Sequence, residues 1–226
     1  MHSKRYLILL KINIIPKKLL SLQLNNLGKK YNKEWVFRNL NFTIIANQKL
    51  VILGGNGSGK STLLQIISGF LTQNEGEIDY SLINNKIEPQ ELKNYISFAS
   101  PYFQLIEEFT LQEILEHCLI FKPYVNNFSA KQIIDLIELD GAKNKLVKQF
   151  SSGMKQRLKL GLAILSDTPL LLLDEPLSNL DKKSITWYQE LVVNHCKERT
   201  VIVCSNAIDD EFNFCNAELN VMDYKK

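Results

Sequence analysis

Short apolar runs alternate with helical patterns along most of the chain. Three runs are apolar at every position, which is typical of parallel strands covered on both faces, at 50–53, 170–173 and 201–204. Two further strands are predicted at 42–45 and 95–99. Helices are predicted directly after Lys60, directly before Asp167 and at about 182–197. This alternation predicts an α/β fold built on a mostly parallel sheet.

The pattern changes in residues 90–160, where helical spacing replaces the alternation, at 111–121 and 130–139. The second of these helices should begin with a capping box formed by Ser129 and Gln132. It should end at Gly141, because glycine readily adopts the left-handed backbone that closes a helix. The simplest explanation of this change in pattern is a mostly helical lobe inserted into the α/β sheet.

The first residues differ from the rest in charge. The 226-residue chain has a net charge of +3, but residues 1–33 carry eight basic side chains and no acidic one, which leaves −5 for the remainder. The excess of basic side chains therefore lies at the N-terminus and does not indicate a nucleic-acid-binding face. Residues 1–19 precede the first segment with domain character, 20–27, and lack the cleavage site of a secretory signal. Two interpretations stay open: a surface-binding leader, or an extension that the domain does not need.

The apolar content and the cysteine spacing indicate which class of protein this is. Hydrophobic residues make up 45% of the chain, enough for a large core. No stretch approaches the roughly 18 uninterrupted apolar residues that a membrane-spanning helix needs. The four cysteines show no C-x-x-C spacing, which favours reduced thiols in a cytosolic protein. We therefore expect one large domain that is not itself inserted in a membrane.

A glycine-rich string, GGNGSGKST at 54–62, fits the phosphate-binding pattern G-x-x-x-x-G-K-[ST]. It follows an apolar strand and opens a helix, so backbone N–H groups and the helix N-terminus should attract phosphate groups. We expect Lys60 to contact the β- and γ-phosphates, and Ser61 to bind Mg²⁺ through its hydroxyl. The predicted nucleotide-binding residues of this phosphate loop are Gly54, Gly55, Asn56, Gly57, Ser58, Gly59, Lys60, Ser61 and Thr62.

Two carboxylates follow the buried strand at 170–173. Asp174 and Glu175 stand at its C-terminal end, which faces the ligand crevice in an open α/β sheet. We expect Asp174 to position Mg²⁺, directly or through water, and Glu175 to polarise the attacking water as general base. ATP and Mg²⁺ are therefore the predicted substrate and cofactor.

A third string, SSGMKQR at 151–157, precedes the acid pair. With the other two strings it makes residues 20–222 resemble the nucleotide-binding subunit of an ABC transporter, where this place is held by the signature LSGGQ. The resemblance implies a P-loop NTPase core with an antiparallel β portion on its N-terminal side and an inserted helical lobe. In that family the signature begins a helix whose N-terminus faces the γ-phosphate held by the other protomer. The matching residues are Ser151, Ser152, Gly153 and Met154, with Ser152 and Met154 departing from the usual Gly and Gln.

The resemblance assigns two more nucleotide contacts. The string SNLD at 178–181 matches the segment that follows the catalytic Glu and crosses the dimer interface, with Asp181 as its acid. Asp181 could equally cap the next helix, and the two roles are compatible. Tyr31 takes the place of the aromatic residue that stacks on adenine, with Trp35 and Phe37 as its competitors.

Two departures from the family pattern concern catalysis. Ser100 stands where the family has a Gln that senses the γ-phosphate and Mg²⁺, and Gln104 could substitute only if the loop is rearranged. Asn206 stands where the family has a His that contacts the γ-phosphate, and an amide cannot carry charge. Because Lys60 and Glu175 are retained, the expected outcome is slow hydrolysis, with Ser100 and Asn206 as weakened catalytic contacts.

The resemblance implies a partner as well as an activity. Two copies, or this chain and a homologous ATPase subunit, should close around two ATP molecules and drive a separate integral membrane permease. The chain is then cytoplasmic and peripheral on the inner face of the cell membrane, without direct membrane insertion and without a nucleic-acid partner. The segment 101–108 is the candidate contact for the permease. The alternatives are an ATP-binding regulatory protein with little hydrolysis and a non-transport ABC protein, although the latter usually has two such domains.

Overall fold

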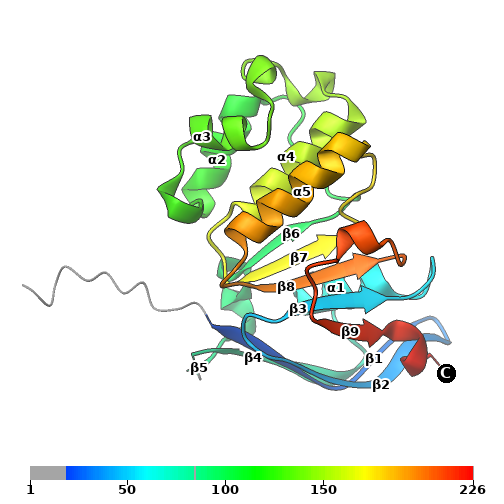
Figure 1. Ribbon diagram of the computed structural model, residues 1–226. Coiled ribbons are helices and arrows are strands. Elements are labelled where there is room, and N and C mark those ends of the chain that lie inside the picture. The colour runs from blue at the N-terminus through cyan, green and yellow to red at the C-terminus, as the bar shows by residue number, and fades with distance from the viewer. Residues whose placement is uncertain (1–18, 84, 226) are drawn as a thin grey trace, which may run out of the picture.

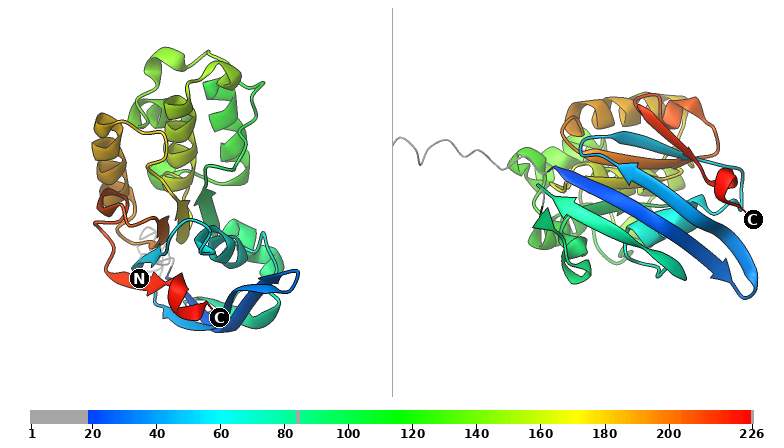
Figure 2. Two further views of the ribbon diagram at one scale, coloured as in Figure 1. Left: turned by 90° about the vertical axis from the view of Figure 1, so that its right-hand side faces the viewer. Right: turned by 90° about the horizontal axis from the view of Figure 1, so that it is seen from below.

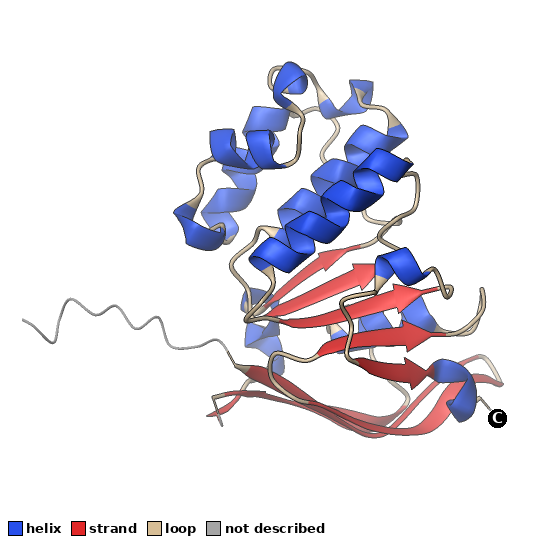
Figure 3. Ribbon diagram, in the orientation of Figure 1, coloured by secondary structure: helices blue, strands red, loops and turns tan. Residues whose placement is uncertain are grey.

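Two sheets and a helical lobe make up the part of the chain that the computed structural model describes, residues 19–83 and 85–225 (Figure 1). The basic extension expected at residues 1–19 lies outside these residues except for its last position. The helical lobe and the helix Lys182–His195 lie above the parallel sheet, and the antiparallel sheet lies below it (Figure 3). The predicted α/β fold with its antiparallel portion and helical lobe is therefore confirmed.

The parallel sheet carries the strands that the sequence predicts most clearly. Its order is β6-β7-β8-β3-β9, and every neighbouring pair is parallel. The strands are β3 (Lys49–Leu53), β6 (Ile96–Ala99), β7 (Leu170–Asp174), β8 (Thr200–Ser205) and β9 (Ala217–Asn220). Every residue of β7 and β8 is buried, which explains why these runs are apolar throughout.

The side chains of the central strands alternate between two hydrophobic cores. Leu171, Leu173, Val201 and Val203 pack with the helical lobe, whereas Leu170, Leu172 and Ile202 pack with the antiparallel sheet. Alternation follows from the two-residue repeat of a strand. The first helix, α1 (Lys60–Ile67), contributes four buried aliphatic side chains to the second core, which fixes the end of the phosphate loop.

The antiparallel sheet forms a separate layer, seen from below in Figure 2. Its order is β2-β1-β4-β5, with β1 (Leu20–Tyr31), β2 (Glu34–Ile44), β4 (Glu75–Leu82) and β5 (Asn85–Lys86). The predicted strand at 42–45 is the end of β2, which begins ten residues before Ile44. This sheet places Tyr31 and Val36, at the β1–β2 turn, beside the phosphate loop.

The lobe is built from α2 (Leu111–Phe121), α3 (Ala130–Leu136) and α4 (Ser152–Ile164), and α5 (Lys182–His195) lies next to α4 (Figure 1). The predicted strand at 95–99 is β6, which lies within residues 90–160 but belongs to the parallel sheet. Short 3-10 turns connect these elements, at Pro89–Asn94, Val125–Asn127, Asp140–Ala142, Val147–Gln149, Asp209–Glu211 and Val221–Tyr224. No helix among the described residues has both the length and the apolar character to span a membrane.

The capping box at the start of α3 is present, but the predicted end of this helix is wrong. The Ser129 hydroxyl accepts from the Gln132 N–H, and the Gln132 side chain accepts from the Ser129 N–H. Helix α3 ends at Leu136, and the chain turns at Glu138, whose φ is +54°. Gly141 instead lies in the 3-10 turn Asp140–Ala142. Glu138 is a non-glycine residue at this strained position, and it forms an ion pair with Arg157 at 2.8 Å.

Candidate active site

The phosphate loop connects the C-terminal end of β3 to the N-terminus of α1. Gly59 caps the helix with a φ of +106°, and a Cβ there would lie 2.3 Å from Val36 Cγ1. Gly54 has a φ of +152°, and a Cβ there would lie 2.5 Å from Ser58 Oγ. Both positions therefore need glycine, because only glycine combines this backbone with so little space.

Lys60, the first residue of α1, folds back under the loop. Its side chain is buried, and Nζ donates to the carbonyl oxygens of Gly54 at 2.7 Å and Gly55 at 3.1 Å. Nζ also donates to Asn206 Oδ1 at 2.6 Å. The Ser58 hydroxyl is buried and has no hydrogen-bond partner among the described residues. A buried ammonium and a free donor at a helix N-terminus form a site suited to an anion.

Asp174 is the centre of an oxygen cluster at the end of β7. It is 1% exposed, and its Oδ1 accepts from Ser61 Oγ at 3.0 Å while Oδ2 accepts from Ser100 Oγ at 3.3 Å. Burial raises the pKa of Asp174, and the two hydroxyl donors oppose that shift. Carboxylate and hydroxyl oxygens are ligands that Mg²⁺ prefers, so Ser61 and Asp174 fit the predicted metal site.

Asn206 connects Lys60 to Glu175. Its Nδ2 donates to Glu175 Oε1 at 2.8 Å, while its Oδ1 accepts from Lys60. Glu175 adopts a left-handed backbone with a φ of +44°, and its N–H donates to Cys204 O at 3.0 Å. The amide therefore has its acceptor toward the cation and its donor toward the carboxylate.

A pocket of about 480 Å³ opens in front of these groups, which we call the nucleotide pocket. It is lined by Asn56–Thr62 of the loop and by Tyr31, Val36, Tyr102 and Glu175. Of the three aromatic candidates, Tyr31 lines this pocket and is half exposed. Trp35 instead lies under the cations of Lys30 and Arg38, and Phe37 is buried in the core.

Three lining or supporting residues were not predicted from the sequence: Val36, Tyr102 and Glu211. Tyr102 lines the nucleotide pocket and is 78% exposed. Its position two residues after Ser100 is the sequence feature from which its place at the pocket could have been predicted. Glu211 is 1% exposed; its Oε1 accepts from the Leu177 N–H at 3.3 Å, and its backbone carbonyl accepts from the Tyr188 hydroxyl at 2.9 Å. Burial raises the pKa of Glu211. No local pattern marks this residue, because its contacts come from two other segments.

Gln104 does not take the place of Ser100 in this structure. It lines the neighbouring surface together with Phe103 and Leu105, and it is not among the residues that line the nucleotide pocket. Ser100 is the residue that contacts Asp174.

A second pocket of about 420 Å³ is lined by four of the predicted contacts of the signature segment and its neighbour, Ser151, Gly153, Met154 and Asp181, whereas Ser152 does not line it. Ser151 caps α4 by accepting from the Met154 N–H at 3.2 Å, so α4 begins at Ser152 with Gly153 in its first turn. Asp181 caps α5 by accepting from the Ser184 N–H at 2.8 Å, as one of its two expected roles requires. The second pocket shares no lining residue with the nucleotide pocket. One copy of the chain therefore assembles the loop and the acid pair, but holds the signature segment apart from them.

The fold and this site define the class of protein. A phosphate loop between β3 and α1, facing an acid pair at the end of a neighbouring parallel strand, is the arrangement of a P-loop nucleoside triphosphatase. A family model described as ABC transporter matches residues 37–178. The chain therefore belongs to the ABC transporter family, of which it forms the nucleotide-binding ATPase domain.

Relatives and solved structures agree with this assignment. The chain is 31% identical over 195 residues to the cytochrome c biogenesis ATP-binding export protein CcmA of Reclinomonas americana, covering 85% of this chain and 87% of that protein. It is 30% identical to the aliphatic sulfonates import ATP-binding protein SsuB of Bacillus cereus, over 87% of this chain and 79% of the relative. A dimeric structure of the ATP-binding cassette MJ0796, in a post-hydrolysis state with ADP and Pi, has a TM-score of 0.74 and 29% identity, covering 88% of this chain and 93% of that chain.

Proposed function

We propose that this chain binds Mg²⁺–ATP, closes on a second copy or on a homologous ATPase subunit, and hydrolyses ATP to drive a separate integral membrane permease from the cytoplasmic side. The main observation that supports this proposal is that the nucleotide pocket and the second pocket are separate in one copy of the chain. The nucleotide pocket lacks the signature segment, and the second pocket lacks a phosphate loop. A second chain facing the first would bring the two halves together at each nucleotide.

The nucleotide pocket has the groups that ATP and Mg²⁺ require. Lys60 and the free hydroxyl of Ser58 would bind phosphate oxygens, and Ser61 and Asp174 would hold the metal ion. Bound Mg²⁺ supplies positive charge that neutralises the phosphate oxygens as the terminal bond breaks. Lys60 would exchange its bonds to the loop carbonyls for bonds to phosphate. Tyr31 would stack on the adenine ring.

Glu175 is the general base of this proposal. Its carboxylate lines the nucleotide pocket and accepts a hydrogen bond from Asn206, so its orientation is fixed before ATP binds. The carboxylate takes the proton of the attacking water, and Lys60 balances charge on the phosphate. Because Asn206 is uncharged, its bond to the γ-phosphate is weaker than the bond of a protonated imidazole. Ser100 is shorter than Gln and acts through water, so turnover is slow.

The permease would dock on an aromatic surface beside Ser100. Phe103 contacts Phe98 and Phe70 with ring centroids 4.8 and 5.5 Å apart, and Phe70 is 68% exposed. A groove of about 260 Å³ next to them is lined by Leu105 and Ile106 of the segment 101–108. The neighbouring Glu108 favours a partner segment that is apolar with a basic end, whereas Glu107 is paired with Lys155. A movement of this segment would be transmitted to Asp174 through the hydrogen bond that Ser100 donates to it.

Phosphate release from Mg²⁺–ATP by the wild-type chain and by Glu175→Gln tests the activity. We expect slow hydrolysis in the wild type and at least a roughly hundredfold loss in Glu175→Gln, with ATP still bound, since the amide cannot accept the proton. Equal rates in both proteins would show that Glu175 is not the base. A regulatory ATP-binding protein is the second candidate, favoured by Ser100 and Asn206, and it predicts ATP binding without hydrolysis even when the permease is added.

A further inference from the structure

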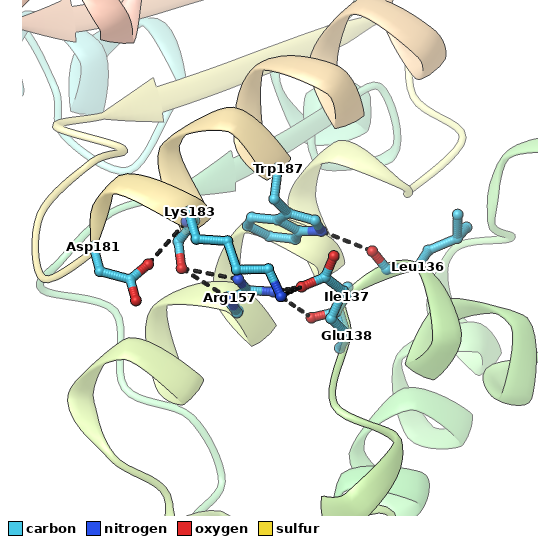
Figure 4. Close-up of polar contacts among 8 residues, drawn as sticks. Leu136, Ile137, Glu138, Arg157, Asp181, Lys183 and Trp187 are labelled. Atoms are coloured by element: carbon cyan, nitrogen blue, oxygen red, sulfur yellow. Dashed lines mark hydrogen bonds and ion pairs between the residues drawn. The ribbon is translucent and has the colours of Figure 1, made fainter.

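Arg157 joins three segments of the chain at the wall of the second pocket (Figure 4). It lies on α4, six residues after Ser151, and its side chain is 12% exposed. Nε and Nη2 donate to Ser184 Oγ on α5 at 3.2 and 2.9 Å. Nη1 donates to Glu138 Oε2 at 2.8 Å, just after the end of α3. A single guanidinium thus links the signature helix, the lobe and the helix capped by Asp181.

The contacts on α5 extend this link to its N-terminus. The backbone N–H of Ser184 donates to Asp181 Oδ1, so the residue that accepts from Arg157 is also the one that Asp181 caps. The guanidinium lies 4.7 Å from the centre of the Trp187 ring, one turn further along α5. The Trp187 indole in turn donates to Leu136 O at 2.8 Å, which ties α5 to the last residue of α3.

These contacts are specific to a guanidinium. Its planar fork donates to Ser184 and Glu138 at once and stacks on Trp187 with its face, whereas an ammonium is a compact charge without a stacking surface. Lys183 also approaches Glu138, at 3.6 Å, but that lysine is largely exposed and such a pair contributes little. Arg157 therefore connects α4 to two residues of α5 and to Glu138.

We propose that Arg157 is a positioning residue that holds the N-termini of α4 and α5 in the relative placement needed to receive the nucleotide of a second copy. The proposal rests on the proposed function, because it assumes that two copies enclose ATP. Ser151 and Gly153 at one helix and Asp181 at the other line the same pocket, and Arg157 connects the two helices that carry them.

The test uses the full chain in a Glu175→Gln background, which keeps bound ATP intact. Dimerisation is measured with Mg²⁺–ATP by analytical ultracentrifugation, and ATP binding to the monomer by a fluorescent ATP analogue at low protein concentration. We expect Arg157→Ala to weaken ATP-dependent dimerisation at least tenfold while monomer affinity for the analogue changes less than twofold. Arg157→Lys should stay defective. Lys155→Ala, which removes a cation of the same helix that bonds Glu107, should dimerise like its parent.

Other results of this experiment would contradict the proposal in distinguishable ways. If Arg157→Ala dimerises like its parent, Arg157 does not position the two helices. If Arg157→Ala is unfolded, Ser184→Ala decides, because it removes only the hydroxyl acceptor and keeps the backbone bond to Asp181. We expect dimerisation weakened about threefold or more in that variant, and an unchanged constant would overturn the proposal. If the parent itself fails to dimerise with ATP, two copies of this chain do not enclose the nucleotide, so the homodimeric form of the proposed function and this inference are both wrong.

Discussion

Replacing Asn206 with Ala removes the amide bridge between the phosphate loop and the catalytic carboxylate. Lys60 Nζ lies 2.6 Å from Asn206 Oδ1, and Glu175 Oε1 lies 2.8 Å from Nδ2. Both partners are charged, so each bond contributes about 1.5–3 kcal/mol. Lys60 keeps its bonds to the carbonyls of Gly54 and Gly55, and the loss therefore falls mainly on the orientation of Glu175.

The expected effect is on the rate rather than on ATP binding. A loss of about 1.5–3 kcal/mol in the positioning of the base corresponds to a roughly 10- to 150-fold fall in kcat. KM for ATP should change less than about threefold, because Lys60 keeps its bonds to Gly54 and Gly55 and Tyr31 still lines the pocket. The loss of an interaction made only in the transition state lowers kcat without raising KM. Phosphate release at saturating Mg²⁺–ATP measures the first quantity, and its dependence on ATP concentration measures the second.

Two further variants separate orientation from charge. Asn206→His introduces a group that carries charge when protonated, so we expect faster hydrolysis than in the wild type. Asn194→Ala, an exposed position near the end of α5, is the control and should leave kcat unchanged. A kcat for Asn206→Ala within twofold of the wild type would refute the orientation of Glu175 by Asn206, and an unchanged kcat for Asn206→His would refute the argument from charge.

Three other substitutions test the pocket and its support. Gly59→Ala should lower the free energy of unfolding by about 1–3 kcal/mol in urea titrations, because the new Cβ would clash with Val36 and the backbone at this position is left-handed. Gly55→Ala is the control and should leave the free energy of unfolding unchanged, because no atom lies within 4 Å of the added Cβ. Tyr31→Ala should raise KM for ATP about fivefold or more, because base stacking contributes about 1–3 kcal/mol, and Tyr31→Phe should not. Burial raises the pKa of Glu211 above its unfolded value, so its charged form destabilises the fold. The thermal stability of the wild type should fall relative to Glu211→Gln as pH rises above about 4.5, and parallel curves would contradict this.

The central strands could be predicted from the sequence because burial on both faces leaves a continuous apolar run. The runs at 170–173 and 201–204 fall within β7 and β8 and differ from them by at most one residue at either end. Strand β1 and all but the end of β2 were not predicted, and the reason is physical. Asn26 and Asn39 adopt left-handed backbones at points where the pairing of the two strands shifts register, so the alternation of apolar residues is interrupted.

The local parts of the candidate site could also be predicted. The phosphate loop and the acid pair are each contiguous in the sequence, and their spacing alone indicates their chemistry. The network of Arg157 could not be predicted, because Glu138 and Ser184 lie nineteen residues before it and twenty-seven after it. Contacts of this kind depend on how helices pack, which a single sequence does not specify.

The bridge made by Asn206 follows from strand order. Strand β8 lies between β7 and β3, so the residue after β8 stands between Glu175 and the phosphate loop. A group at this place must accept from the ammonium of Lys60 and donate to a carboxylate at the same time. A carboxylate would repel Glu175, and an ammonium would repel Lys60. An amide meets both requirements, because its oxygen accepts from Lys60 while its nitrogen donates to Glu175.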